Sequence, residues 1–175
     1  SFPTRRSSDL FLKTKKYKDI LSFVDKDLKM ILSPSFNYDK VEDGISIPTP
    51  EEAARYFCSQ LLSGDKTTDN IQGLPNFSPE FQQKYNTGKT RGIGKATANI
   101  LVEGKSIKEM FSLVIEAYKS YYGEEKKEFV SFRGETFNWN WLDYLRENAT
   151  LLWMRREENE IYNIEDTFKR LKLEY

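Results

Sequence analysis

Two short runs decide what this chain is expected to be: SGDKTTDNIQGLP at residues 63–75 and RGIGKATA at residues 91–98. In the first run, Asp65 and Asp69 are four residues apart, a spacing that on a helical turn puts both carboxylates on one face. Such a pair can hold a divalent cation. In the second run, the glycines of Gly92–Gly94 let backbone N–H groups approach a phosphate at the positive end of a helix. The sequence therefore predicts metal and phosphate binding in one molecule, as phosphodiester chemistry requires.

A second pair of aspartates, Asp25 and Asp27, follows the apolar run 17–24, which predicts a mostly buried strand. In open α/β sheets, ligands sit at such strand ends. Converging carboxylates repel one another unless a cation neutralises them. We therefore expect Mg²⁺ or Mn²⁺ at one site, with four candidate metal ligands that are also the candidate catalytic residues: Asp25, Asp27, Asp65 and Asp69. The alternative is that they are ordinary loop and cap aspartates.

The Gly-x-Gly turn lies in a stretch, 81–102, that carries four cations and no acids. Arg91 and Lys95 flank the turn and could add positive charge at a phosphate site. Thr97 follows the turn, and its hydroxyl could donate a hydrogen bond to the phosphate. The candidate DNA-binding residues are Arg91, Gly92, Ile93, Gly94, Lys95 and Thr97. Backbone amides and basic side chains read phosphate rather than base edges, which predicts binding without sequence preference. An isolated Gly-x-Gly is also typical of a simple tight turn.

Composition narrows the chemistry further. The chain has 27 basic and 27 acidic residues, one cysteine and no histidine, so disulfides, Cys/His zinc sites and histidine-dependent triads are excluded. Cys58 falls in an apolar helical pattern and is predicted to be an inert core thiol. No apolar run is long enough to span a bilayer. We expect a soluble protein of the cytoplasm, the host-cell cytoplasm if the gene belongs to a phage.

Local signals predict a little sheet followed by mostly helix. Thr49, Pro50 and Glu52 form a strong helix start, and Ser106 with Glu109 forms a second capping box. The expected elements are strands at 17–24 and 45–47, a short helix at 26–32, helices at 49–64, 95–102, 106–121, 139–156 and 164–171, and a loop at 72–90 with a turn at 79–85. Residues 11–72 and 73–175 are expected to form two regions.

Residues 1–10, SFPTRRSSDL, resemble a translated sequencing adapter and are excluded from this reasoning. We accordingly expect the natural reading frame to continue upstream of Phe11.

Taken in order, Asp-x-Asp at a strand end, a long helix, Gly-Asp-x-x-x-Asp-Asn-Ile-x-Gly and Gly-Ile-Gly-x-x-x-Ala resemble the structure-specific 5′ nuclease superfamily, particularly bacteriophage 5′→3′ exonucleases and flap endonucleases. The resemblance implies the C-terminal part of an α/β, PIN-like nuclease domain with a helix-hairpin-helix element. It also implies hydrolysis of DNA phosphodiesters with two Mg²⁺ or Mn²⁺ ions, K⁺ held at the hairpin, and a monomer acting on duplex or flapped DNA during replication. The family's other ligands would lie upstream, so the chain alone is expected not to cleave.

The sequence departs from the family at two places. The later aspartates are usually three apart rather than four, and residues 76–90 are inserted before the glycine turn. The insertion is interpreted as a surface loop, or as an extension of the DNA surface through Lys84, Tyr85 and Lys89. A non-catalytic duplex-binding module is the main alternative function, and a ribonuclease of a related toxin-like fold is a third.

Two other groups of residues are predicted to have structural rather than functional roles. The aromatic residues near the C-terminal helices are predicted to belong to the core rather than to stack on bases: Phe137, Trp139, Trp141, Tyr144 and Trp153. Residues 155–158 are predicted to be a solvated helix end.

Overall fold

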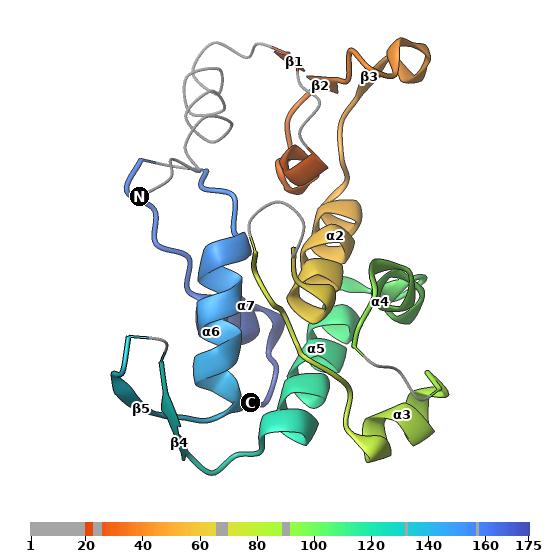
Figure 1. The fold of residues 1–175 in the computed structure, drawn as a ribbon. Helices are drawn as coiled ribbons and strands as arrows, with labels where there is room; N and C mark the ends of the chain where they lie inside the picture. The colour runs from red at the N-terminus through yellow and green to blue at the C-terminus, as the bar shows by residue number, and fades with distance from the viewer. Residues whose placement is uncertain (1–19, 23–25, 66–69, 89–91, 132, 157) are drawn as a thin grey trace.

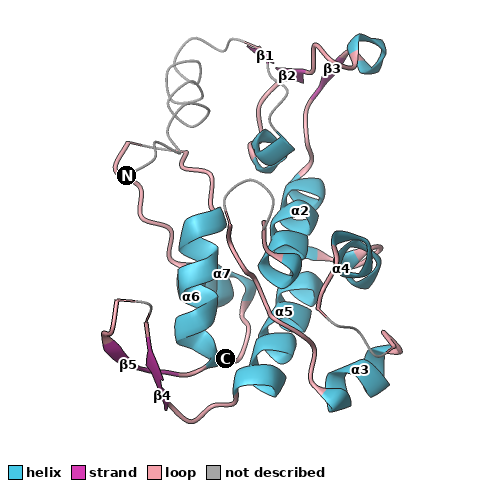
Figure 2. Ribbon diagram, viewed as in Figure 1, coloured by secondary structure: helices cyan, strands magenta, loops and turns pink. Residues whose placement is uncertain are grey.

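The computed structural model describes residues 20–22, 26–65, 70–88, 92–131, 133–156 and 158–175. The described residues form a mixed α/β protein that is mostly helical, with six α-helices, two 3₁₀ helices and two small sheets (Figure 1; Figure 2). Three of the predicted site residues, Asp25, Asp69 and Arg91, lie outside the described residues. The strand predicted at 17–24 is described only from residue 20 to residue 22.

The first sheet has the order β1-β2-β3 and is drawn at the top of the ribbon in Figure 1. Strand β1 (Leu21–Ser22) runs parallel to β2 (Ser35–Phe36), which pairs antiparallel with β3 (Ile45–Ser46). A 3₁₀ helix, η1 (Lys26–Met30), connects β1 to β2, and a second, η2 (Val41–Asp43), precedes β3. The predicted short helix after the first strand and the strand at 45–47 are therefore confirmed in slightly shorter form.

Helix α2 (Pro50–Ser63) begins and ends where the sequence indicates. The side chain of Thr49 accepts from the N–H of Glu52 at 3.2 Å, and the carboxylate of Glu52 accepts from the N–H of Thr49 at 2.8 Å. These two bonds satisfy backbone donors that the first turn of a helix leaves without partners. Gly64 caps the other end with a positive φ of 70°.

The later helices are α3 (Pro79–Tyr85), α4 (Lys95–Val102), α5 (Ile107–Tyr122), α6 (Trp141–Leu152) and α7 (Ile164–Leu171). Helix α3 is the turn predicted inside the long loop, and Ser78 caps it. The Ser106–Glu109 capping box is present at the start of α5. The predicted helices at 95–102, 106–121 and 164–171 are confirmed to within a residue at each end.

The helix predicted at 139–156 is wrong at both ends. Trp139 belongs instead to a β-hairpin that was not predicted, made of β4 (Lys127–Val130) and β5 (Thr136–Trp139). Asn140 then caps α6 by accepting from the N–H of Leu142 at 3.1 Å. Cross-strand stacking of aromatic rings stabilises the hairpin, with the centroids of Phe129 and Phe137 5.4 Å apart.

The prediction of a solvated helix end at 155–158 is wrong for Arg156. Its guanidinium lies over the Trp153 ring, 4.5 Å from the centroid, and donates to the carbonyl of Met30 at 3.0 Å. Arg156 is half-buried because its side chain packs between Met30, at the end of η1, and Trp153, just after α6.

One hydrophobic core joins α2 to α4, α5, α6 and α7 (Figure 1). Cys58 is fully buried there, and burial raises the pKa of its thiol, which confirms the inert core thiol. Trp141 is buried as predicted, whereas Phe137, Trp139, Tyr144 and Trp153 are half-buried at the edge of the core or on the hairpin. The predicted boundary at residue 72 stays a prediction; core residues from both sides of it pack in this cluster.

Within the described part of the chain, no helix combines the length and the apolar character needed to cross a membrane.

Candidate metal and phosphate site

Asp65 follows directly on the C-terminal cap of α2, and its side chain is only 1% exposed. Its backbone forms an isolated antiparallel bridge with Ile71, through N–H···O bonds of 2.9 and 3.0 Å. The N–H of Leu74 also donates to the carbonyl of Leu62 at 3.0 Å. The chain therefore returns along the end of α2, and the position of Asp65 is set by backbone bonds on both sides.

Gly64 and Gly73 are the reason this return is possible. A Cβ on Gly64 would lie 2.2 Å from the carbonyl oxygen of Ile71, and one on Gly73 would lie 2.3 Å from the nitrogen of Gly64. Both glycines have positive φ, which L side chains rarely adopt. The two glycines of the first sequence run thus pack backbone against backbone, and this contact holds residues 71–73 against the end of α2.

The second sequence run, at the start of α4, lies close to Asp65. Gly94 is the N-cap of α4 and provides no side chain to satisfy the first backbone N–H groups, while Ile93 is buried in the core. Lys95, the first residue of the helix, places its Nζ 3.8 Å from Oδ1 of Asp65. The lysine side chain is 52% exposed, so it also reaches solvent. Thr97, two residues after Lys95, is half-buried.

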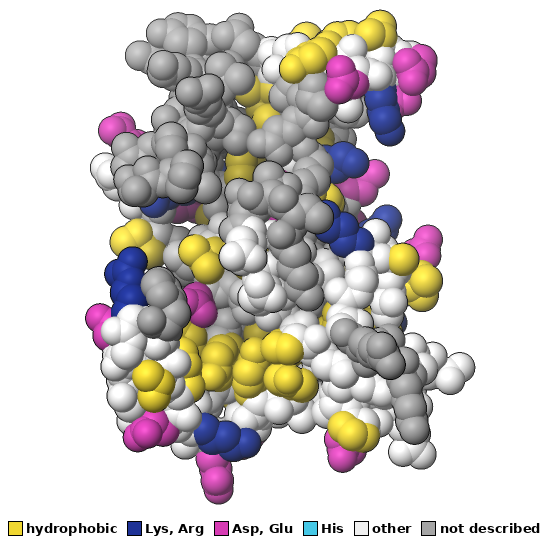
Figure 3. All heavy atoms as spheres, in the orientation of Figure 1, with side chains coloured by type: hydrophobic (Ala, Val, Ile, Leu, Met, Phe, Trp, Pro, Cys, Tyr) yellow, Lys and Arg dark blue, Asp and Glu magenta, His cyan; other side chains and the backbone are white. Residues whose placement is uncertain are grey.

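Helices α2 and α4, which flank the two runs, pack directly against each other. The hydroxyl of Ser59 on α2 donates to Oδ1 of Asn99 on α4 at 2.6 Å. On the face drawn in Figure 3, both Lys or Arg and Asp or Glu side chains lie over the region of these helices. Asp65 and Lys95 are thirty residues apart in sequence, and this helix pair brings them within ion-pair distance.

Asp27 of η1 is held against α2 by two side chains of that helix. Its Oδ1 accepts from the hydroxyl of Tyr56 at 3.0 Å and from Nε2 of Gln60 at 3.0 Å. Tyr56 and Gln60 are one helical turn apart, so both side chains face η1. Sequence reasoning missed these two residues, although a polar pair at this spacing within an otherwise apolar face was a usable signal.

Other predicted features are not brought together among the described residues. No group of three or more Asp, Glu, Cys or His side chains with metal-binding geometry occurs in that part of the chain. In the insertion, Lys84 and Tyr85 both donate to the Glu116 carboxylate of α5, at 2.6 and 2.7 Å. The lysine is therefore engaged by an acid, which favours the surface-loop interpretation of the insertion.

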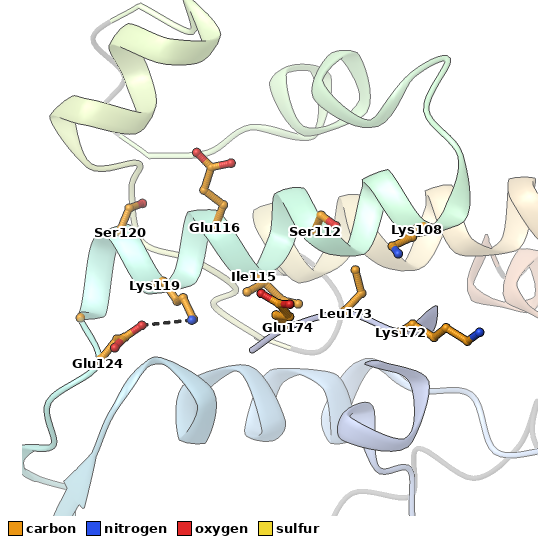
Figure 4. A pocket seen from close by; sticks show the side chains of 11 residues that line it. Lys108, Ser112, Ile115, Glu116, Lys119, Ser120, Glu124, Lys172, Leu173 and Glu174 are labelled. Carbon is orange, nitrogen blue, oxygen red and sulfur yellow. Dashed lines mark ion pairs between the residues drawn. The ribbon is translucent and has the colours of Figure 1, made fainter. Parts of the chain in front are cut away.

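A hollow with a volume of about 790 Å³ lies between α5 and the residues after α7 (Figure 4). None of the predicted site residues lines it. Its charged side chains are of both signs: Lys108, Lys119, Lys172, Glu116, Glu124 and Glu174. An open, mixed-charge hollow offers no preference for a polyanion, so this hollow and the Asp65–Lys95 region are separate features.

Comparisons with family models, with curated proteins and with solved structures give no match to this chain. The function must therefore be argued from the site's own residues and from the motifs that they form.

Proposed function

We propose that this chain is the C-terminal part of a PIN-like nuclease domain and belongs to a divalent-metal-dependent 5′→3′ exonuclease or flap endonuclease acting on DNA. The observation that carries the proposal is the juxtaposition of Asp65, from the aspartate-rich run, with Lys95, from the Gly-x-Gly run, at 3.8 Å. The run predicted to bind metal and the run predicted to bind phosphate thus each contribute one charged side chain to this contact.

The electrostatics of this point suit a cation and a phosphate together. A carboxylate that is almost fully buried is costly unless nearby positive charge compensates it. Lys95 supplies part of that charge, yet its ammonium is half-exposed and can turn toward a phosphate. A divalent ion at Asp65 would take over the compensation and leave Lys95 and the first N–H groups of α4 to the DNA backbone.

The described residues fit a hard cation in the chemistry of their donors. Asp27, beside Tyr56 and Gln60 of α2, and Asp65, just after the C-cap of that helix, each provide carboxylate oxygens, and sequence reasoning adds Asp25 and Asp69. Bound Mg²⁺ or Mn²⁺ ions would supply an activated water and stabilise the leaving oxygen during hydrolysis. Lys95, Thr97 and the backbone of Gly92–Gly94 would hold the duplex, without reading its sequence, and K⁺ would bind the carbonyls of this hairpin.

A module that only binds duplex DNA is the competing function. Such a protein gains nothing from carboxylates beside its phosphate site, because they repel the polyanion. The position of Asp65 next to α4 therefore favours the nuclease.

Mn²⁺ binding to the purified chain tests the proposal. Free Mn²⁺ can be followed by electron paramagnetic resonance, with Mg²⁺ as a competitor. We expect Asp65→Asn to weaken Mn²⁺ binding at least tenfold, because a hard cation loses a charged oxygen ligand. Asp43→Asn, on the exposed η2, is the matched control and should bind like the wild type. Equal binding by the wild type and Asp65→Asn would refute the metal site and favour the binding module.

A further inference from the structure

Gln60 is a buried polar residue whose orientation is set by its neighbours. Its side chain is 4% exposed, and its Nε2 lies 3.0 Å from Oδ1 of Asp27 and 3.4 Å from the hydroxyl oxygen of Tyr56. An ionised carboxylate can only accept hydrogen bonds, so the NH₂ group must face Asp27 and the amide oxygen must face away from it.

The amide oxygen of Gln60 is left without a donor. Its Oε1 is buried and has no hydrogen-bond partner among the described residues. A buried acceptor of this kind loses its hydration without compensation, and native proteins rarely leave one unsatisfied. A buried water commonly fills such a place. Beside a carboxylate proposed to bind metal, the donor of choice is a water of the cation's own shell, because Mg²⁺ keeps several waters when proteins bind it.

We propose that Gln60 is a positioning residue of the metal site: its Nε2 fixes the Asp27 carboxylate, and its Oε1 accepts a hydrogen bond from a water held by the divalent cation. This inference rests on the nuclease function proposed above. It assigns to α2 a role beyond scaffolding, since this helix presents Gln60 and Tyr56 to Asp27, and Asp65 follows directly on its C-cap. Partners that orient a metal ligand in this way commonly change metal affinity by about 10–100-fold when they are replaced.

Nuclear magnetic resonance of the wild-type chain tests the inference without relying on activity. With nitrogen-15 labelling, Mg²⁺ should shift the side-chain amide resonances of Gln60, and trace Mn²⁺ should broaden them. The backbone amide of Ile71, which bridges to Asp65, reports independently on whether any metal binds nearby. Gln82 is the matched internal control, because its amide donates to the carbonyl of Phe77 at the start of α3 and should not respond.

Two variants separate the roles of the amide. Gln60→Met keeps the size of the side chain and removes both hydrogen-bonding groups, so we expect Mn²⁺ affinity to fall 10–100-fold. Tyr56→Phe removes the other donor to the same Asp27 oxygen but leaves Oε1 in place, so its loss should be several-fold smaller. Far-ultraviolet circular dichroism checks that both variants are folded.

The possible failures are distinguishable. If Mn²⁺ broadens Ile71 but leaves the Gln60 amide unchanged, metal binds without Gln60, and the inference fails while the proposed function stands. Equal losses in Gln60→Met and Tyr56→Phe would overturn the role of Oε1 alone. If Mn²⁺ broadens neither resonance in the folded wild type, the metal site itself is refuted and the inference falls with it.

Discussion

Replacing Gly64 with alanine should show how strongly the fold depends on the return of the chain at the end of α2. The backbone of Gly64 has φ 70° and ψ −176°, a region that is essentially restricted to glycine. The new methyl group would also lie 2.2 Å from the carbonyl oxygen of Ile71 and 2.6 Å from that of Gln72. These are backbone atoms and cannot rotate away, so the bridge between Asp65 and Ile71 must open.

The expected loss of stability has two parts. Holding alanine in this backbone region costs about 1–3 kcal/mol. Opening the bridge removes two backbone hydrogen bonds, each with a net contribution of about 1 kcal/mol. The free energy of unfolding should therefore fall by roughly 3–5 kcal/mol. In a chain of this size, each kcal/mol lowers Tm by about 2–4 °C, so a drop of roughly 10 °C is expected.

Gly44→Ala is the matched control. Gly44 has nearly the same backbone conformation, φ 65° and ψ −154°, but a Cβ there would meet no atom within 4 Å. Only the backbone part of the cost applies, so urea titration followed by circular dichroism should place Gly64→Ala about 2 kcal/mol below Gly44→Ala. Indistinguishable midpoints and slopes for the two variants would show that the close contact between Gly64 and Ile71 does not contribute to stability.

Two further predictions concern charge and pH. Binding to duplex DNA should be independent of sequence, and log K plotted against log salt should have a slope of about −3. Lys95→Ala should reduce the size of that slope by about one, whereas the control Lys127→Ala, on the exposed hairpin, should leave it unchanged. If Lys95→Ala does not change the slope, α4 is not part of the DNA-binding surface. Because burial raises the pKa of Cys58 and of Tyr118 above their ordinary values of 9.0 and 10.0, both groups stay protonated in the folded state while they ionise in the unfolded chain. Stability should thus be full below pH 9 and decline by about 1.4 kcal/mol per pH unit above pH 9, where Cys58 ionises in the unfolded chain, and by about as much again per unit above pH 10, where Tyr118 does so. The decline should be less steep in Cys58→Ala, as urea titrations at several pH values can verify.

Sequence reasoning was most successful where the signal is local. The capping boxes at Thr49 and Ser106 are satisfied within four residues, so helix starts could be read directly from residue types. The hairpin before α6 was missed because Trp139 was read as the start of a helix, and Phe137 was assigned only to the core. Their alternation with asparagine has the period of a strand, and Gly134, with φ 78°, marks the turn.

Long-range contacts could not be predicted in the same way. The sequence indicated that Asp65 and Lys95 belong to one site, but the distance between them depends on how α2 packs against α4. The partners of Asp27 depend on the docking of η1 against α2, and the burial of Arg156 depends on a carbonyl 126 residues away in the chain. Residue types alone carry no record of such contacts.

The most direct test of the central claim, that one site holds both metal and phosphate, is the affinity for a 5′-flapped duplex with and without a divalent ion. Fluorescence anisotropy with Ca²⁺ in place of Mg²⁺ allows the measurement on uncut DNA. If the ion and the phosphate share the site at Asp65, the divalent ion should tighten DNA binding by the wild type, since it neutralises carboxylates that repel the backbone. Asp65→Asn should bind DNA as well as the wild type or better without the ion, and should gain less from adding it. An affinity that is indifferent to the divalent ion, and unchanged by Asp65→Asn in the folded protein, would contradict the account.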